Sequence, residues 1–170
     1  MNHLESLARE WLEWNGHIVR ANIMVGKRAA GGHDMEVDVV AYDPKGGAIK
    51  HYELSLDAQS WEKRRQRFEK KFQMARRYMF EEIFPFLSID TPIHQFAVLP
   101  NDGQKEIAGG QVISVDDFVA AIAREVMAER KASKAAIHEQ YPLLRQTQFL
   151  LCGYHKVPDL TPKPLQPDCT

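Results

Sequence analysis

Cysteine is nearly absent from this 170-residue chain, which contains only Cys152 and Cys169. Two cysteines without a metal-ligand spacing indicate neither a disulfide framework nor a structural zinc site. The seven histidines are scattered, and no two are spaced as His-x-x-x-His. A long apolar run is also missing, and the first residues already have the pattern of an amphipathic helix. No membrane span or signal peptide is therefore predicted, and the expectation is a soluble cytoplasmic protein.

An excess of charge of one sign is missing as well. The formal net charge is −1, with 22 basic and 23 acidic residues, so the overall charge identifies no partner. The length is that of one domain with a core of its own, which we expect over residues 1–156. Four prolines in the last fourteen residues predict an extended or disordered tail over 157–170.

The most informative stretch runs from His33 to Ser55. Two short apolar runs, 37–42 and 48–56, flank the turn sequence Asp-Pro-Lys-Gly-Gly, which predicts a β-hairpin. Side chains alternate across a strand, so Glu36 and Asp38 share one face of the first strand. His51, Glu53 and Ser55 share one face of the second. Three carboxylates then converge and suit a hard cation such as Mg²⁺, unless the acids simply face water.

A long basic helix is expected after the hairpin, over about 60–80. Its apolar positions recur at helical spacing, and eight cations precede Tyr78 against only two glutamates. Such a segregated charge can bind a nucleic-acid backbone, although a solvated helix face is an equal alternative. The glycine-rich connection 26–32 adds two further cations. The predicted nucleic-acid contacts are Lys63, Arg64, Arg67, Lys70, Lys71, Lys27 and Arg28.

The remaining elements can be read from periodicity. A helix with a capping box from Asn2 to Glu5 precedes a strand over 17–25. Further strands are expected at 93–99 and 111–115, and a helix follows. Residues 148–152 read as one more strand or as an interface segment. The order is helix, three strands, long helix, strand, short strand and helix, which predicts an α/β fold with a mixed central sheet flanked by helices.

This order, and the segments Gly32–Ala41 and His51–Ser55, resemble the PD-(D/E)XK nuclease superfamily. The family has a restriction-endonuclease-like fold and includes Holliday-junction resolvases and Mrr-type restriction enzymes. The resemblance covers about residues 3–100 and implies that Asp38 and Glu53 bind Mg²⁺ or Mn²⁺. It further implies the Leu54 carbonyl as a third ligand, with Glu5 matching an acid that some branches carry on the first helix.

Ser55 departs from the family pattern, which has a lysine at this position. Three explanations are open: the lysine function moved, with Lys63 as the best candidate; a second metal ion replaces it; or the site is degenerate. His51, on the same face as Glu53, is either a base or a hydrogen-bonding strand residue. Glu36 completes the set of candidate catalytic residues.

The resemblance implies a Mg²⁺-dependent nuclease that acts on DNA in restriction, repair or mobile-element biology. The alternative is a catalytically silent module of the same fold that binds nucleic acid or a protein. A third reading, an ordinary α/β domain, requires Asp38 and Glu53 to lie far apart. A homodimer is also expected to use the apolar segment 141–154.

Overall fold

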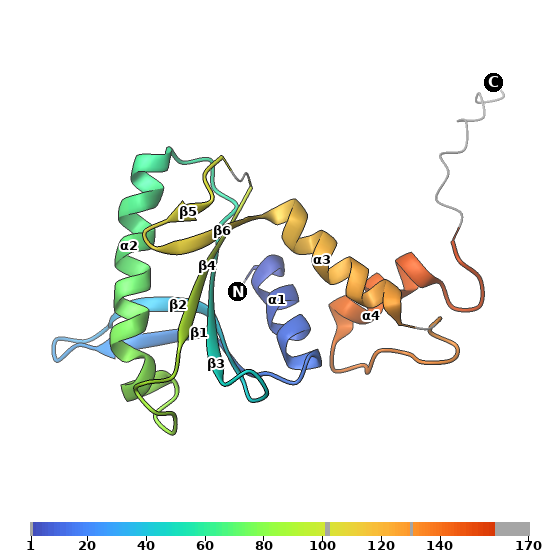
Figure 1. Ribbon diagram of the computed structural model, residues 1–170, viewed down its shortest axis with the longest axis horizontal. Helices are drawn as coiled ribbons and strands as arrows, with labels where there is room; N and C mark the ends of the chain where they lie inside the picture. The colour runs from blue at the N-terminus through green and yellow to red at the C-terminus, as the bar shows by residue number, and fades with distance from the viewer. Residues whose placement is uncertain (1, 101–102, 130, 159–170) are drawn as a thin grey trace. The chain divides into compact units, whose positions relative to one another are not determined.

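The computed structural model describes residues 2–100, 103–129 and 131–158 (Figure 1). Contacts between residues divide the chain into two compact units, Met1–Ile122 and Ala123–Thr170. The single domain predicted over 1–156 spans both units. Most of the predicted tail, from residue 159 onward, lies outside the described residues. In the part that is described, no helix combines the length and hydropathy needed to cross a membrane.

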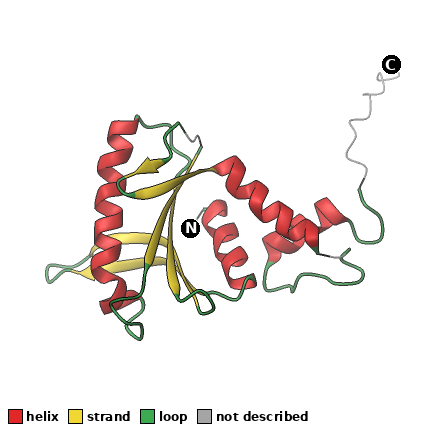
Figure 2. Cartoon of the chain, viewed as in Figure 1, coloured by secondary structure: helices red, strands yellow, loops and turns green. Residues whose placement is uncertain are grey.

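The first unit contains a mixed six-stranded sheet (Figure 2). In spatial order its strands are β1 (Ile18–Lys27), β2 (His33–Asp43), β3 (Ala48–Leu54), β4 (Ile93–Leu99), β6 (Gly110–Ser114) and β5 (Glu106–Ile107). The pairs β1–β2, β2–β3 and β5–β6 are antiparallel, whereas β3–β4 and β4–β6 are parallel. The α/β class and the mixed sheet were predicted correctly. The two-residue strand β5 has no sequence signal of its own.

Helices cover both faces of this sheet. They are α1 (His3–Trp14), α2 (Trp61–Tyr78) with its π-helical continuation η1 (Met79–Ile83), and the start of α3 (Val115–Ala128). On β3, the His51 ring contacts Phe72 of α2, whereas the next residue, Tyr52, contacts Phe118 of α3. Phe118 in turn meets Trp11 of α1. Because adjacent strand residues point to opposite faces, α2 covers one face and α1 with α3 covers the other.

The β2–β3 register brings the predicted acids together. Val39 pairs with Tyr52 and Val40 with His51, so the next position along each strand sets Asp38 opposite Glu53. Both side chains lie on the α2 face, because they are two residues from Val40 and His51 respectively. The reading that places the two acids on opposite faces of the sheet is therefore wrong.

Two apolar clusters lie beneath α2 on either side of these acids. One joins Val40 and Ile49 of the sheet to Ala75. The other joins Phe68 and Phe72 to Ala97 and further β4–β6 residues. Burial of these large side chains contributes most of the attachment of α2, at about 25 cal/mol per Å² of apolar surface. Polar groups held between two such clusters are removed from bulk water.

In the second unit, residues 148–152 are helical, which corrects the predicted strand. They belong to α4 (Pro142–Cys152). A short apolar run cannot be assigned by periodicity alone, and here Pro142 starts a helix whose buried side is marked by Leu144 and Gln148. Gln148 is fully buried and accepts a hydrogen bond from the Ile137 amide at 2.9 Å.

Candidate functional site

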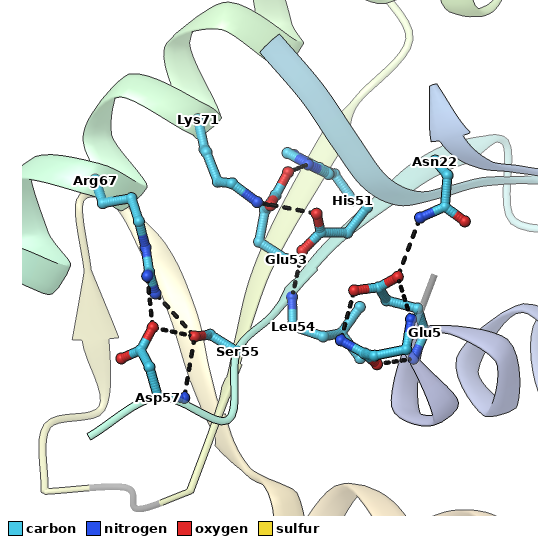
Figure 3. A network of polar contacts seen from close by, with 11 residues as sticks. Glu5, Asn22, His51, Glu53, Leu54, Ser55, Asp57, Arg67 and Lys71 are labelled. Carbon is cyan, nitrogen blue, oxygen red and sulfur yellow. Dashed lines mark hydrogen bonds and ion pairs between the residues drawn. The ribbon is translucent and has the colours of Figure 1, made fainter. Parts of the chain in front are cut away.

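The centre of the site is a lysine between two carboxylates (Figure 3). The Lys71 ammonium group lies 2.9 Å from Asp38 Oδ1 and forms a second ion pair with Glu53. The backbone amide of Leu54 donates to Asp38 Oδ2 at 2.9 Å. Glu53 is fully buried and Asp38 is 8% exposed. Charges removed from water in this way are stable only when paired, and Lys71 supplies the pairing.

A buried hydrogen-bond chain supports Glu53 from behind. His51 Nε2 lies 2.8 Å from Glu53 Oε1, and Gln95 Nε2 lies 3.0 Å from His51 Nδ1. The Gln95 amide also donates to the Phe72 carbonyl at 3.1 Å. His51 therefore does not face water as an ordinary polar strand residue. It fixes the carboxylate next to it.

The environment shifts the pKa values of the two acids in opposite directions. Burial and the neighbouring charge of Glu53 raise the pKa of Asp38 to about 7, although Lys71 acts against this. Burial also opposes ionisation of Glu53, but the hydrogen bonds from His51 and Lys71 and the charge of Lys71 outweigh it and lower the pKa of Glu53. Two interacting carboxylates whose pKa values are pushed apart are typical of functional sites.

The same two acids raise the pKa of Lys71 despite its burial. Lys71 is therefore a permanent cation at neutral pH. It can stabilise negative charge near the two carboxylates, but it cannot act there as a neutral base.

Ser55, where the resemblance to the nuclease superfamily led us to expect a lysine, anchors a second cation. Arg67 donates to the Ser55 hydroxyl at 2.9 Å and lies 2.5 Å from Asp57 Oδ2. The Ser55 hydroxyl also donates to Asp57 at 2.5 Å. Burial opposes ionisation of Asp57, yet the hydrogen bonds from Ser55 and Arg67 lower its pKa to about 2. Ser55 therefore holds an arginine in place instead of carrying the charge itself.

A pocket of about 220 Å³ opens beside these groups. Polar side chains dominate its wall, and two cations and two acids project toward the same space. Its lining residues are Glu5, Asp38, Leu54, Ser55, Arg67, Phe68 and Lys71. This volume holds a small polar group, such as one phosphate with its waters, and the lining contains both signs of charge.

Glu5 forms the predicted helix cap and also lies at the pocket, while its role as a metal ligand stays a prediction. It closes the predicted capping box with Asn2, because each residue bonds to the backbone amide of the other. It also lines the pocket and accepts a hydrogen bond from Asn22 Nδ2 at 3.0 Å. Asn22 has φ of 52° within β1, a left-handed conformation that asparagine tolerates.

Several predicted residues lie elsewhere. Lys63 is exposed on α2, eight residues before Lys71, and it is Lys71 that reaches the acids. Eight residues are about 12 Å along a helix, so the two lysines cannot serve the same site. Glu36 is exposed at a position that does not line the pocket.

Among the predicted nucleic-acid contacts, Arg64 is placed differently from expectation. It is 3% exposed and donates to the Asp57 carbonyl at 2.5 Å, so it anchors the start of α2 instead of facing solvent. Lys27 and Arg28 are exposed near the β1–β2 turn, where Arg28 pairs with Asp34. Lys70 is exposed on α2.

The central role of Lys71 was missed, although the sequence contains a signal for it. Lys71 lies three residues after Phe68 and four before Ala75, so it borders the apolar stripe that faces the sheet. Gln95 was missed because nothing in a strand sequence marks one polar residue as part of a buried chain. Arg67 was expected to contact nucleic acid, but its anchoring by Asp57 was not foreseen.

The carboxylates of Asp38 and Glu53 are oxygen donors, the type of ligand that Mg²⁺ requires. Within the described ranges, no group of three His, Cys, Asp or Glu side chains is arranged to hold a metal ion. Mg²⁺, however, commonly uses one or two carboxylates and keeps several waters. Asp38 and Glu53 already share one cation, Lys71, and burial together with the charge of Glu53 raises the pKa of Asp38. The residues fit a hydrated hard cation.

Comparison with known proteins adds no relative. No protein-family model matches the chain, and no curated protein matches it.

Proposed function

We propose that the first unit has a restriction-endonuclease-like fold and is a metal-dependent nuclease that acts on DNA. The observation that carries the proposal is the convergence of Asp38 and Glu53 on Lys71, next to a pocket that Asp38 and Lys71 line. An acid from one strand, an acid from the next and a lysine are the three groups of the PD-(D/E)XK motif. Here the lysine comes from the helix that follows the motif strand.

Each residue has a defined task in phosphodiester hydrolysis. Water adds to phosphorus, the bond from phosphorus to the leaving oxygen breaks, and that oxygen takes up a proton. Asp38 and Glu53, with the Leu54 carbonyl, would hold Mg²⁺ or Mn²⁺, which when bound lowers the pKa of its water and neutralises phosphate charge. Lys71 stabilises the extra negative charge that develops on the phosphate oxygens. Arg67, held by Ser55 and Asp57, positions the phosphate.

The helix α2 supports binding of a nucleic-acid backbone beside this pocket. At about 100° per residue, Lys63 and Lys70 project within about 90° of the direction of Arg67 and Lys71. Glu62 and Glu69, the acids of this helix, project on the other flank. One side of α2 is therefore basic, and it borders the pocket that contains the acids. Such contacts supply position and affinity but no base recognition.

The decisive experiment is a cleavage assay on supercoiled, linear and branched DNA with Mg²⁺ or Mn²⁺. The control is the double variant Asp38→Ala, Glu53→Ala. We expect metal-dependent cutting that the double variant loses. Equal cutting by the parent and the variant would refute this active site.

A catalytically silent binding module is the second candidate, and one observation favours it. Lys71 already forms an ion pair with each carboxylate, so the cluster can serve as a closed structural ion network that needs no metal. In that case the parent binds DNA through α2 but cuts no substrate with either metal. Mn²⁺ titration separates the two functions, because the silent module takes up no metal at Asp38 and Glu53.

A further inference from the structure

The structure contains a polar residue far from the motif that reaches the site through a second residue. Gln95 lies on β4, 44 residues after His51, and it is 5% exposed. Its amide nitrogen makes two hydrogen bonds, to His51 Nδ1 at 3.0 Å and to the Phe72 carbonyl at 3.1 Å. Both hydrogens of the amide are thus used at once.

The Phe72 carbonyl determines how this amide is oriented. A carbonyl oxygen only accepts, so the Gln95 group that faces it must be the NH₂ and not the oxygen. The same NH₂ faces His51 Nδ1, which must then be the acceptor nitrogen of the ring. In a neutral imidazole the other nitrogen carries the hydrogen. His51 Nε2–H therefore donates to Glu53 Oε1, 2.8 Å away.

This orientation has a cost that apolar packing would avoid. Among the residues that the structure describes, Gln95 Oε1 is buried and has no hydrogen-bond partner. A buried unsatisfied acceptor destabilises the folded state, and a leucine at this position would remove that cost. Such exceptions call for a functional explanation, and the explanation here is control of the His51 ring.

We propose that Gln95 is a positioning residue that fixes the Nε2–H tautomer of His51 and thereby holds Glu53 in one orientation as an acceptor for a cation. The chain runs from the Phe72 carbonyl through Gln95 and His51 to Glu53. Without Gln95, the ring can carry its hydrogen on Nδ1, and the lone pair of Nε2 then faces the carboxylate. That contact is repulsive, so Glu53 loses the hydrogen bond that orients it. The catalytic consequence rests on the proposed nuclease function, whereas the tautomer does not.

The first test is nitrogen-15 NMR of the His51 ring in the full chain, with His51→Gln used for assignment. We expect a protonated Nε2 and an unprotonated Nδ1 in the parent. In Gln95→Leu we expect this single tautomer to be replaced by a mixture. A parent with its hydrogen on Nδ1, or a Gln95→Leu variant that keeps the parent pattern, overturns the proposal. The measurement on the parent needs no variant to fold.

The second test is Mn²⁺ binding followed by electron paramagnetic resonance. Loss of a group that orients a ligand weakens metal binding by about 10–100-fold, and we expect this for Gln95→Leu. Gln111→Leu is the matched control, because Gln111 is an exposed glutamine on β6 that is not part of the chain to Glu53. Equal weakening in both variants, or in neither, would contradict a positioning role.

The two proposals fail in different ways. If the parent binds no Mn²⁺ and cuts no DNA, the nuclease function is wrong, and the NMR result alone decides the role of Gln95. If the parent cuts DNA while Gln95→Leu keeps both the tautomer and the metal affinity, the nuclease function stands and the positioning role is wrong.

Discussion

At the scale of single residues, Lys71 sets the charge balance of the site. Replacing it with methionine keeps the apolar stem but leaves two buried carboxylates facing each other without a cation. Loss of one group that stabilises developing charge commonly lowers kcat by about 10²–10³, so we expect at least a ~100-fold fall for Lys71→Met. Steady-state cleavage of a labelled duplex at saturating Mg²⁺ and DNA measures it.

Lys63→Met is the matched control for that change, because it removes the same group from an exposed position of the same helix. Its kcat should stay within about twofold, since the group only contributes to backbone binding. The double variant Ser55→Lys, Lys71→Met places an ammonium group at the family position and should recover part of the rate. A larger loss for Lys63→Met than for Lys71→Met would contradict the assigned roles.

Asp38 makes the stability of the protein depend on pH. Its pKa is about 7 in the folded chain against 3.8 for the free group. The folded state therefore binds the Asp38 proton more tightly than the unfolded state does. The resulting stabilisation of the folded state is complete below pH 3.8 and is lost as the pH rises to 7. The free energy of unfolding of the parent, minus that of Asp38→Asn, should fall by on the order of 3 kcal/mol between pH 4 and 7.

Urea denaturation of both proteins at each pH measures this difference. A difference that stays flat, or that rises with pH, would mean that Asp38 is not held by burial and by Glu53. Saturating Mg²⁺ should reduce the fall, because a bound cation favours the ionised carboxylate.

The sequence reveals the acids but not their partners, and the reason is physical. Strand alternation and a clear turn are local properties, so Asp38 and Glu53 could be placed on facing strands. Which lysine of α2 reaches these acids depends on where the helix crosses the sheet. The packing of Phe68 and Phe72 against the sheet determines that position. The contact of Gln95 with His51 depends on the pairing of β3 with β4, which a local sequence pattern does not predict.

At the scale of elements, the β1–β2 hairpin is held against the end of α2 at Gly26. This glycine has φ of 71°, and a Cβ there would lie 2.6 Å from both Asp34 Oδ2 and the Tyr78 hydroxyl. Those two groups are hydrogen-bonded to each other at 2.6 Å. The hairpin can approach α2 this closely only because the residue has no side chain.

Gly26→Ala should therefore destabilise the protein by about 2–4 kcal/mol, through both backbone strain and the clash with Tyr78. Gly31→Ala is the control, because it has φ of 93° with no atom within 4 Å of the added Cβ. It should cost only about 1 kcal/mol, from the backbone alone. Thermal unfolding of both variants makes the comparison, and equal costs would show that the hairpin does not dock as described.

Elements differ in how well a local pattern predicts them. The β2–β3 hairpin was predicted because Pro44 and two glycines mark its turn and apolar runs flank it. The helix α4 was not predicted, because its apolar run Phe149–Cys152 fits the pattern of a strand as well as that of a helix. Its N-cap residue, Tyr141, also makes no side-chain hydrogen bond that would mark a helix start. The π-helical η1 was missed because it continues the helical periodicity of α2 without a break.

At the scale of the whole molecule, the proposed binding of nucleic acid depends on where the positive charges lie and not on the net charge. The net charge is −1, so a diffuse attraction is absent. Lys63 and Lys70 lie on the flank of α2 that borders the pocket, whereas Arg65 and Arg76 project on the opposite flank. All four side chains belong to exposed residues. The pairs are thus matched in charge and exposure but differ in direction.

We therefore expect Lys63→Gln, Lys70→Gln to weaken DNA binding equally across sequences, whereas Arg65→Gln, Arg76→Gln leaves it nearly unchanged. Each lost phosphate contact reduces the slope of log affinity against log salt by about 1, so the first pair should lose about 2. Fluorescence anisotropy of two unrelated duplexes over a salt series measures the slopes. Similar slopes for the two pairs would mean that DNA is not bound along this flank, because the charge change is identical and only the direction differs.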